Sequence, residues 1–355
     1  MRRQGRSRRV AGLLLVLALL WTLLGAPLTG AEWAGIPARL QRSWRQLPSY
    51  MVRVATLWFD AAQGAQAEET SLHLRVYDTE AGAVRLLPLE AYVVGVVAAE
   101  MPASWPPEAL ACQAVAARTR AVGSSAAYGG NGCALHPEAD VCTDSTCCQG
   151  WLSPEARKAS WGDGALPCEK RVRQAVASTA GQVLTYDGAP IEVLYHASSG
   201  GQTEDAAEVF AMRVPYLQSV VSPGEEGYDG YAREQRFPLT EAAAKLAEAF
   251  PDSGVEADAL PAQLELLALT ETGRVKEMRV GSVTATGRDV RQALGLRSTM
   301  FTWECQGKEI IFSVRGYGHG VGMSQAGACA MAAAGAAYEE ILAHYYPGTT
   351  LTTVK

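Results

Sequence analysis

Apolar and polar residues recur along this chain in patterns that predict short strands and helices from about residue 71 onward. The segment LHLRVYD (72–78) alternates in polarity and predicts a strand. The segment EAYVVGVVAAEMP (90–102) is densely apolar and stops at Pro102. Pro106-Pro107-Glu108 then marks the start of a second helix, because prolines are tolerated in a first turn, and this helix is expected to reach about Val122.

The second half of the chain contains two strand-turn-strand patterns. One is GQVLTYDGAPIEVLYHAS (181–198), with Asp187-Gly188 in the turn, and the other is LELLALTETGRVKEMRVG (264–281). A further strand, EIIFSVRG, leads through a glycine-rich loop into an alanine-rich helix that is expected to end near Ala337. Because strands and helices are mixed without a repeating βαβ order, the pattern predicts an α+β body, and we expect it to contain a central groove.

Two segments interrupt this pattern. Residues 123–168 form a Cys-rich loop, rich in Gly, Ser and Asp, that is long enough to need its own cross-link. The segment LTEAAAKLAEAF (239–250) has helical composition with Thr240 as a candidate cap, so an inserted surface helix is expected within about residues 223–262.

The N-terminus predicts export or anchorage. Five arginines precede 22 uncharged residues, 10–31, which is enough for a helix to cross a bilayer core. The positive-inside rule would then place the rest of the chain outside the cytoplasm, with residues 32–70 as a juxtamembrane spacer. A cleaved signal peptide ending at Thr29-Gly30-Ala31 is the alternative.

Composition and charge exclude several classes of protein. With 355 residues, 48% hydrophobic and 19% charged, the chain is neither disordered nor fibrous. The net charge of −6 becomes −11 once the five N-terminal arginines are set aside. An acidic body makes nucleic acid an unsuitable partner, because phosphates are bound mainly by Lys and Arg.

Glu100 is the candidate general acid. It lies in the sequence AAEMP, directly after the apolar run VVGVV. Apolar surroundings penalise a charged carboxylate and raise its pKa toward the range that a general acid needs. The residue pattern alone leaves open a solvent-facing Glu100, or one paired with an arginine such as Arg118.

The loop GYGHGVGMSQAGA (316–328) is the candidate substrate-binding segment. Its four alternating glycines allow close backbone approach to a polymeric ligand. We expect Tyr317 to stack on a sugar ring, with His319, Ser324 and Gln325 bonding to hydroxyls. A simple glycine-rich turn with a buried histidine is the alternative.

Eight cysteines outside the cytoplasm suggest disulfides, yet one local cluster suggests a metal. The segment HPEADVCTDSTCCQGW offers His136, Cys142, Cys147 and Cys148, a donor set that suits tetrahedral zinc. Such a closed set would be structural, so the chemistry itself would need no cofactor. Disulfides through these cysteines would exclude the zinc site.

Several motifs taken together resemble the stage II sporulation protein D family over about residues 71–350. They are LPLEAYVVGVVAAEMPASWPPEALACQAVAARTRA, ADVCTDSTCCQGW, YHASSGGQTEDAAEVF, VPYLQSV and GYGHGVGMSQAGA. The resemblance implies a membrane-anchored lytic transglycosylase that cleaves peptide-free peptidoglycan strands during engulfment, with Glu100 as its catalytic residue. It further implies substrate-site roles for the following residues: Gln113, Arg118, His196, Gly200, Gly201, Tyr317 and His319.

The resemblance also implies partners and a zinc pattern. The expected partners are the stage II sporulation proteins P and M, and the zinc pattern of some members matches His136, Cys142 and Cys148. Two other functions remain open: a hydrolase that pairs Glu100 with Glu204 or Asp205, and a wall-binding module that enhances an amidase.

Overall fold

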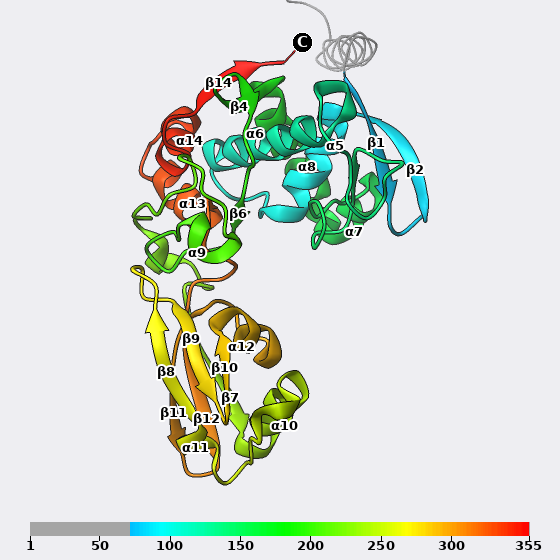
Figure 1. The fold of residues 1–355 in the computed structure, drawn as a ribbon. Coiled ribbons are helices and arrows are strands. Elements are labelled where there is room, and N and C mark those ends of the chain that lie inside the picture. Colours follow the sequence, from blue (N-terminus) through cyan, green and yellow to red (C-terminus); the bar gives the residue numbers. More distant parts are fainter. Residues whose placement is uncertain (1–71, 355) are drawn as a thin grey trace, which may run out of the picture. The chain divides into compact units, whose positions relative to one another are not determined.

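A computed structural model describes residues 72–354 of this protein (Figure 1). The predicted first strand is confirmed as β1, which pairs with the next strand in an antiparallel ladder and with a short third strand in parallel. The sheet has the order β2-β1-β3. Its strands are β1 (His73–Asp78), β2 (Ala83–Pro88) and β3 (Val141–Cys142).

The next elements form a helical core. Helix α5 is apolar on all sides and buries eight of its twelve residues, because other helices pack around it. Helix α6 has Pro107 in its first turn, as predicted, and ends two residues later than expected. The helices are α5 (Leu89–Glu100), α6 (Pro107–Ser124), α7 (Pro154–Trp161) and α8 (Ala165–Ser178).

The first predicted hairpin is confirmed. Strands β4 (Gln182–Tyr186) and β5 (Ala189–Pro190) pair in antiparallel register, and β14 (Thr350–Thr353) adds to the other side of β4. Asp187 and Gly188 both have positive φ, at 49° and 80°. This is the backbone that a two-residue type I′ turn requires, and an Asp-Gly pair adopts it readily.

The C-terminal helical segment is shorter than predicted. Helix α13 (Gln325–Ala333) has Ser324 as its N-cap and ends four residues before Ala337. Gly335 has a φ of 98°, which ends the helix, and α14 (Tyr338–Tyr345) follows. Short strands β6 (Tyr195–His196) and β13 (Met323–Ser324) pair in parallel, and α9 (Ala206–Phe210) lies between them in sequence.

Residues 232–315 have a hydrophobic core of their own, which the prediction of an inserted surface helix did not include. The predicted helix is α10, but it packs with α12 and β7 into this second core, and β8 and β9 form the predicted hairpin. Its N-cap is Pro238 without a side-chain bond, so the cap prediction at Thr240 is wrong. The elements are β7 (Ala232–Pro238), α10 (Leu239–Ala249), α11 (Leu260–Gln263), β8 (Leu264–Leu269), β9 (Val275–Val280), β10 (Val283–Thr286), α12 (Gly287–Leu294), β11 (Met300–Gln306) and β12 (Glu309–Arg315).

The architecture confirms the α+β prediction, with five small sheets and a mixture of helices (Figure 1). Four short 3-10 turns complete it: Ala126–Tyr128, Gly162–Gly164, Glu225–Gly227 and Pro251–Ser253. Within residues 72–354, no helix has both the length and the apolar character needed to cross a bilayer. The predicted anchor or signal and the spacer lie outside the described residues.

Candidate functional site

Glu100 is the last residue of α5, and its side chain is half-buried. The backbone amide of Gly150 donates a 3.0 Å hydrogen bond to its Oε1. Burial raises the pKa of Glu100, while the bond from Gly150 and the side chains of Gln325 and Tyr195 oppose the rise. No Lys or Arg among residues 72–354 forms an ion pair with this carboxylate, so Glu100 is not paired with Arg118. The site therefore holds a proton more readily than a solvated carboxyl does.

Two buried glutamines bond to each other, and one of them, Gln325, lies beside this carboxyl group. Gln325 is the first residue of α13, and its Nε2 donates a 3.2 Å hydrogen bond to Oε1 of Gln113 on α6. On another side, the hydroxyl of Tyr195 donates to Oε1 of Gln149 at 3.1 Å. The structure thus brings the predicted residue Gln325 to Glu100, and Gln113 reaches the site through its bond with Gln325.

His196 and Ser324 are paired neighbours in the parallel ladder of β6 and β13. His196 Nδ1 lies 3.1 Å from the carbonyl oxygen of Val321, and burial lowers its pKa well below the ordinary value, so the ring is neutral. Ser324 Oγ accepts the amide of Gly327 at 3.2 Å. This bond caps α13, so Ser324 positions Gln325 at the start of that helix.

Of the four predicted contact residues in the glycine-rich segment, only Tyr317 is exposed, since Ser324 and Gln325 are buried. Tyr317 is 42% exposed, and its backbone exchanges two hydrogen bonds with Ser198, of 2.7 and 3.0 Å. His319 is half-buried, with its ring 5.5 Å from that of His196. Burial and the nearby Arg291 lower the pKa of His319 to about 4, so it is neutral at neutral pH. A neutral imidazole can donate or accept a hydrogen bond.

Gly200 and Gly201 lie in a turn that encloses a protein carboxylate. Both have positive φ, at 77° and 106°, which glycine adopts without strain. The amide of Gly200 and the hydroxyl of Ser199 donate to the buried carboxylate of Glu225, at 3.2 and 2.6 Å. These glycines therefore shape the backbone around Glu225, and the amide of Gly200 is occupied by that carboxylate.

Arg118 is fully buried and lies apart from the carboxyl group of Glu100. Its guanidinium forms an ion pair of 2.6 Å with Glu90 and donates to the carbonyl oxygens of Val176 and Gln182, at 3.3 and 3.0 Å. These bonds tie α6 to α5, α8 and β4. The arrangement gives Arg118 a structural role that joins these elements.

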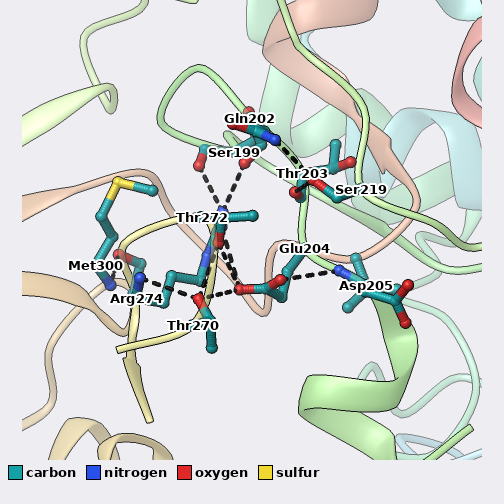
Figure 2. A network of polar contacts seen from close by, with 12 residues as sticks. Ser199, Gln202, Thr203, Glu204, Asp205, Ser219, Thr270, Thr272, Arg274 and Met300 are labelled. Carbon is teal, nitrogen blue, oxygen red and sulfur yellow. Dashed lines mark hydrogen bonds and ion pairs between the residues drawn. The ribbon is translucent and has the colours of Figure 1, made fainter. Parts of the chain in front are cut away.

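Glu204, the second carboxylate of the hydrolase alternative, lies in a closed polar network (Figure 2). Its side chain is 2% exposed and accepts bonds from the hydroxyls of Thr270 and Thr272, at 2.6 and 2.5 Å. Arg274 lies 3.7 Å away and donates to the carbonyl oxygens of Ser199 and Gln202 (Figure 2). Every group in this network has a partner, which is typical of a structural ion pair.

Asp205, the other candidate for that role, is a helix cap. Its Oδ1 accepts the backbone amide of Ala207 at 2.7 Å, at the start of α9. A cap of this kind satisfies an amide that has no partner within the helix. The structure thus places neither Glu204 nor Asp205 as a free carboxylate facing Glu100.

Four cysteine Sγ atoms lie within 4.8 Å of one another: Cys133, Cys142, Cys147 and Cys148. The Sγ atoms of Cys133, Cys147 and Cys148 lie 3.6, 3.7 and 3.8 Å from one another, and none of the four cysteines forms a disulfide. The predicted ligand set is therefore corrected: Cys133 belongs to the cluster and His136 does not. The ring of His136 instead stacks on that of Tyr77, with the ring centres 3.5 Å apart. This partly buried cluster could hold a metal ion.

Sequence reasoning missed three groups in this region. Tyr195 precedes the predicted His196 and Gln149 follows the predicted Cys148. This adjacency is the only feature of the sequence that could have pointed to them as site residues. Gly150 gives no side-chain signal, yet its amide bonds to Glu100. The loop that contains the cysteine cluster supplies both Gln149 and Gly150 to the site. A metal in the cluster would therefore stiffen the backbone that contacts Glu100.

The stage II sporulation protein model of the SpoIID family matches residues 77–186. Stage II sporulation protein D of Bacillus subtilis (strain 168) is 37% identical over 82% of this chain and 82% of its own length. Its counterpart from Bacillus amyloliquefaciens is 36% identical over 80% of each chain. An amidase enhancer of Bacillus subtilis is 29% identical over 73% of this chain and 40% of its own length. On this similarity in sequence, the chain belongs to the stage II sporulation protein D family.

Proposed function

We propose that this protein is a lytic transglycosylase that cleaves peptide-free peptidoglycan strands during engulfment in sporulation, with Glu100 as its acid and base. One observation supports this most directly. Burial raises the pKa of Glu100, and no cation among the described residues is paired with it. A carboxyl group that is protonated more readily than usual, at the end of a rigid helix, is what general acid catalysis requires.

In the proposed reaction, the protonated Glu100 donates its proton to the glycosidic oxygen that leaves C1 of N-acetylmuramic acid. The C1–O bond breaks, and the departing N-acetylglucosamine keeps that proton as a hydroxyl. The resulting carboxylate of Glu100 then accepts the proton of the C6 hydroxyl as its oxygen bonds to C1. This closes a 1,6-anhydro ring and restores the acid, without a water molecule or a second carboxylate.

The residues around Glu100 have complementary roles in this proposal. The Gly150 amide fixes one carboxyl oxygen, so the proton is directed to the other. Gln325 and Gln113 offer amide groups to sugar substituents, and the hydroxyl and ring of Tyr317 remain available at the surface. His319, kept neutral by its surroundings, adds a hydrogen-bonding group without a charge.

A hydrolase that uses Glu100 with a second carboxylate is less well supported. Inverting and retaining glycosidases both need two carboxyl groups that flank the scissile bond. Glu204 is enclosed by hydroxyls and Arg274, and Asp205 caps α9. Neither is free to activate water.

A second candidate function is a non-catalytic wall-binding module that enhances an amidase. It is favoured by the similarity to a relative named as an amidase enhancer. This function would use the exposed Tyr317 and the glutamines but would not need the acid form of Glu100.

We also propose that the cysteine cluster binds structural zinc. A Zn–S bond of about 2.3 Å in a tetrahedron separates the sulfurs by about 3.8 Å. The separations of 3.6 to 3.8 Å among Cys133, Cys147 and Cys148 fit that geometry, and the Sγ atom of Cys142 lies within 4.8 Å of all three. Four thiolates would fill the coordination shell, so the ion would stabilise the loop and leave the chemistry to Glu100.

The cellular setting of this activity is part of the same proposal. An N-terminal span would hold the chain in the cell membrane as a single-pass protein, with residues 72–354 outside the cytoplasm and facing peptidoglycan. The stage II sporulation proteins P and M would be its partners. The acidic charge supports the absence of a nucleic-acid partner.

The decisive experiment incubates the purified full chain with peptide-free glycan strands and identifies the products by mass spectrometry. We expect 1,6-anhydro ends from the native chain and none from Glu100→Gln, while near-UV circular dichroism shows that the variant stays folded. Reducing ends as the main product would establish a hydrolase. Stimulation of an amidase by Glu100→Gln as strong as that of the native chain, with no glycan cleavage by either, would establish the binding module.

A further inference from the structure

A cavity of about 400 Å³ lies between helix α12 and the glycine-rich loop. Three arginines line it, Arg288 and Arg291 from α12 and Arg297 from the segment that follows. Tyr317 of the glycine-rich loop completes the lining. The cavity is thus adjacent to a residue that the proposed function assigns to substrate contact.

These three arginines, of which Arg288 is exposed and the other two are half-buried, differ from two buried arginines of the described residues. Arg118 and Arg274 each lie against a glutamate, whereas Arg288, Arg291 and Arg297 form no ion pair with any carboxylate in residues 72–354. Arg291 is half-buried, and its Nε donates to the carbonyl oxygen of Leu296 at 3.2 Å. The nearby Asp289 caps α12 through Thr286, whose hydroxyl donates to its carboxylate at 2.6 Å, and like the other carboxylates of residues 72–354 it forms no ion pair with these arginines.

Three like charges line one cavity, and that of the half-buried Arg291 is partly desolvated. Burial and the charge of Arg288 lower the pKa of Arg291, whereas Tyr317 opposes the shift. An arrangement of this kind costs stability unless an anion neutralises it. It therefore favours an anionic ligand over the neutral face of a sugar.

The cavity and the glycine-rich loop are mechanically joined. The amide of Gly318 donates to the carbonyl oxygen of Arg297 at 2.9 Å, and the guanidinium of Arg297 lies 5.0 Å from the centre of the Tyr317 ring. A cation over an aromatic ring holds both side chains in place. A sugar on Tyr317 would thus place its substituents within reach of the arginines.

We propose that this cavity binds the lactyl carboxylate that peptide-free N-acetylmuramic acid exposes. The inference rests on the proposed function and adds a reason for its substrate preference. When a stem peptide is attached, this carboxyl group is an amide and has no charge. Once the peptide is removed, the free carboxylate matches the planar guanidinium, which can donate two parallel hydrogen bonds to it.

The test measures binding to Glu100→Gln in the full chain, so that the glycan is not cleaved. The two probes are peptide-free glycan oligosaccharides and the same oligosaccharides with their carboxyl groups converted to N-methylamides. We expect the amides to bind at least about tenfold more weakly, since charge-assisted hydrogen bonds are about twice as strong as neutral ones. Equal affinity for the two probes would overturn the proposal.

Substitutions then locate the effect. Arg288→Gln, at an exposed position that does not endanger folding, and Arg291→Gln should each lower the affinity for the acid probe several-fold and leave the amide unchanged. Arg279→Gln is the matched control, because Arg279 lines a second cavity but is already paired with Glu265 at 3.0 Å. A loss of acid-specific binding in Arg279→Gln but not in the other two would refute the assignment.

Failure of this inference can be distinguished from failure of the proposed function. If the native chain forms anhydro ends from acid and amide strands at the same rate and binds both equally, the carboxylate-binding role of the cavity is rejected and the proposed activity is supported. If neither strand is cleaved but the acid strand is bound preferentially, the carboxylate-binding role of the cavity is supported and the proposed activity is rejected. Tighter binding of phosphate-rich teichoic acid than of the glycan acid would overturn the carboxylate assignment.

Discussion

Glu100 and Glu204 are both removed from bulk water, yet their surroundings differ. Glu204 is surrounded by two threonine hydroxyls and Arg274, so its charge is neutralised. Glu100 has one backbone amide and no cationic partner among the described residues, and burial raises its pKa. The same side chain is thus a structural ion in one place and a candidate proton donor in the other. The difference depends on its partners and not on burial alone.

The largest effect should follow from replacing the unpaired carboxylate. Glu100→Gln keeps the shape of the side chain but removes the transferable proton, so kcat for anhydro-end formation should fall by roughly 10²- to 10⁴-fold, the usual contribution of a general acid. Single-turnover kinetics on peptide-free glycan would measure it. The control is Glu204→Gln, which should affect stability more than the chemical step. A greater loss of turnover in a folded Glu204→Gln would reverse the comparison.

The next largest effect concerns stability and tests the ion pair of Glu204 by replacing its partner, Arg274. Arg274→Met should leave Glu204 buried and uncompensated, which costs about 3–5 kcal/mol of unfolding free energy in comparable cases. Urea denaturation of the full chain measures the change. Arg279→Met, which removes an exposed ion pair with Glu265, should cost no more than about 1 kcal/mol. Equal costs for the two variants would show that the network around Glu204 is not a closed ion pair.

The cysteine cluster should matter for Glu100 because one loop serves both. If zinc fills the cluster as proposed, chelation or the replacement Cys148→Ser should lower the melting temperature by a few degrees, which corresponds to about 1–2 kcal/mol in a domain of this size. Calorimetry with metal analysis would measure both quantities. Cys305→Ser, outside the cluster, is the control. If chelation changed neither stability nor metal content, the cluster would not bind a metal.

The smallest effect is a pH dependence, and its sign follows from the raised pKa of Glu100. The folded state binds this proton more tightly than the unfolded chain, whose glutamates titrate near about 4.3. Ionised Glu100 therefore destabilises the fold, and the stability advantage of Glu100→Gln should appear only as pH rises above the unfolded value. It should level off above the folded pKa. Urea unfolding of both chains across this range tests the sign, and a difference that shrinks with rising pH would contradict it.

Activity should show the complementary behaviour. The proton donor is lost as pH rises through the folded pKa of Glu100, so kcat should fall on the alkaline side. An alkaline limb that persists in Glu100→Asp but shifts would support the assignment. If kcat of the native chain showed no alkaline limb, the protonated form of Glu100 would not be the proton donor of the reaction.

Local patterns predicted those parts of the fold whose causes are local. The Asp187-Gly188 turn and the prolines before α6 impose their backbone angles wherever they occur, so the hairpin and the helix start were found correctly. The cap at Thr240 was predicted wrongly because Pro238 starts the same helix two residues earlier. The second core of residues 232–315 was missed because it joins β7 to β12 across more than sixty residues.

The sequence by itself determined which residues could supply chemistry: one glutamate in an apolar frame, a glycine-rich loop and a group of cysteines. Tertiary structure alone decided their partners. It paired Arg118 with Glu90 and placed Cys133, instead of His136, in the cysteine cluster. It also brought the Gly150 amide within hydrogen-bonding distance of Glu100, fifty residues away in sequence. The physical reason is that a side chain's type is set at its own position, whereas its pKa and its ligands depend on groups that only folding brings within a few ångströms.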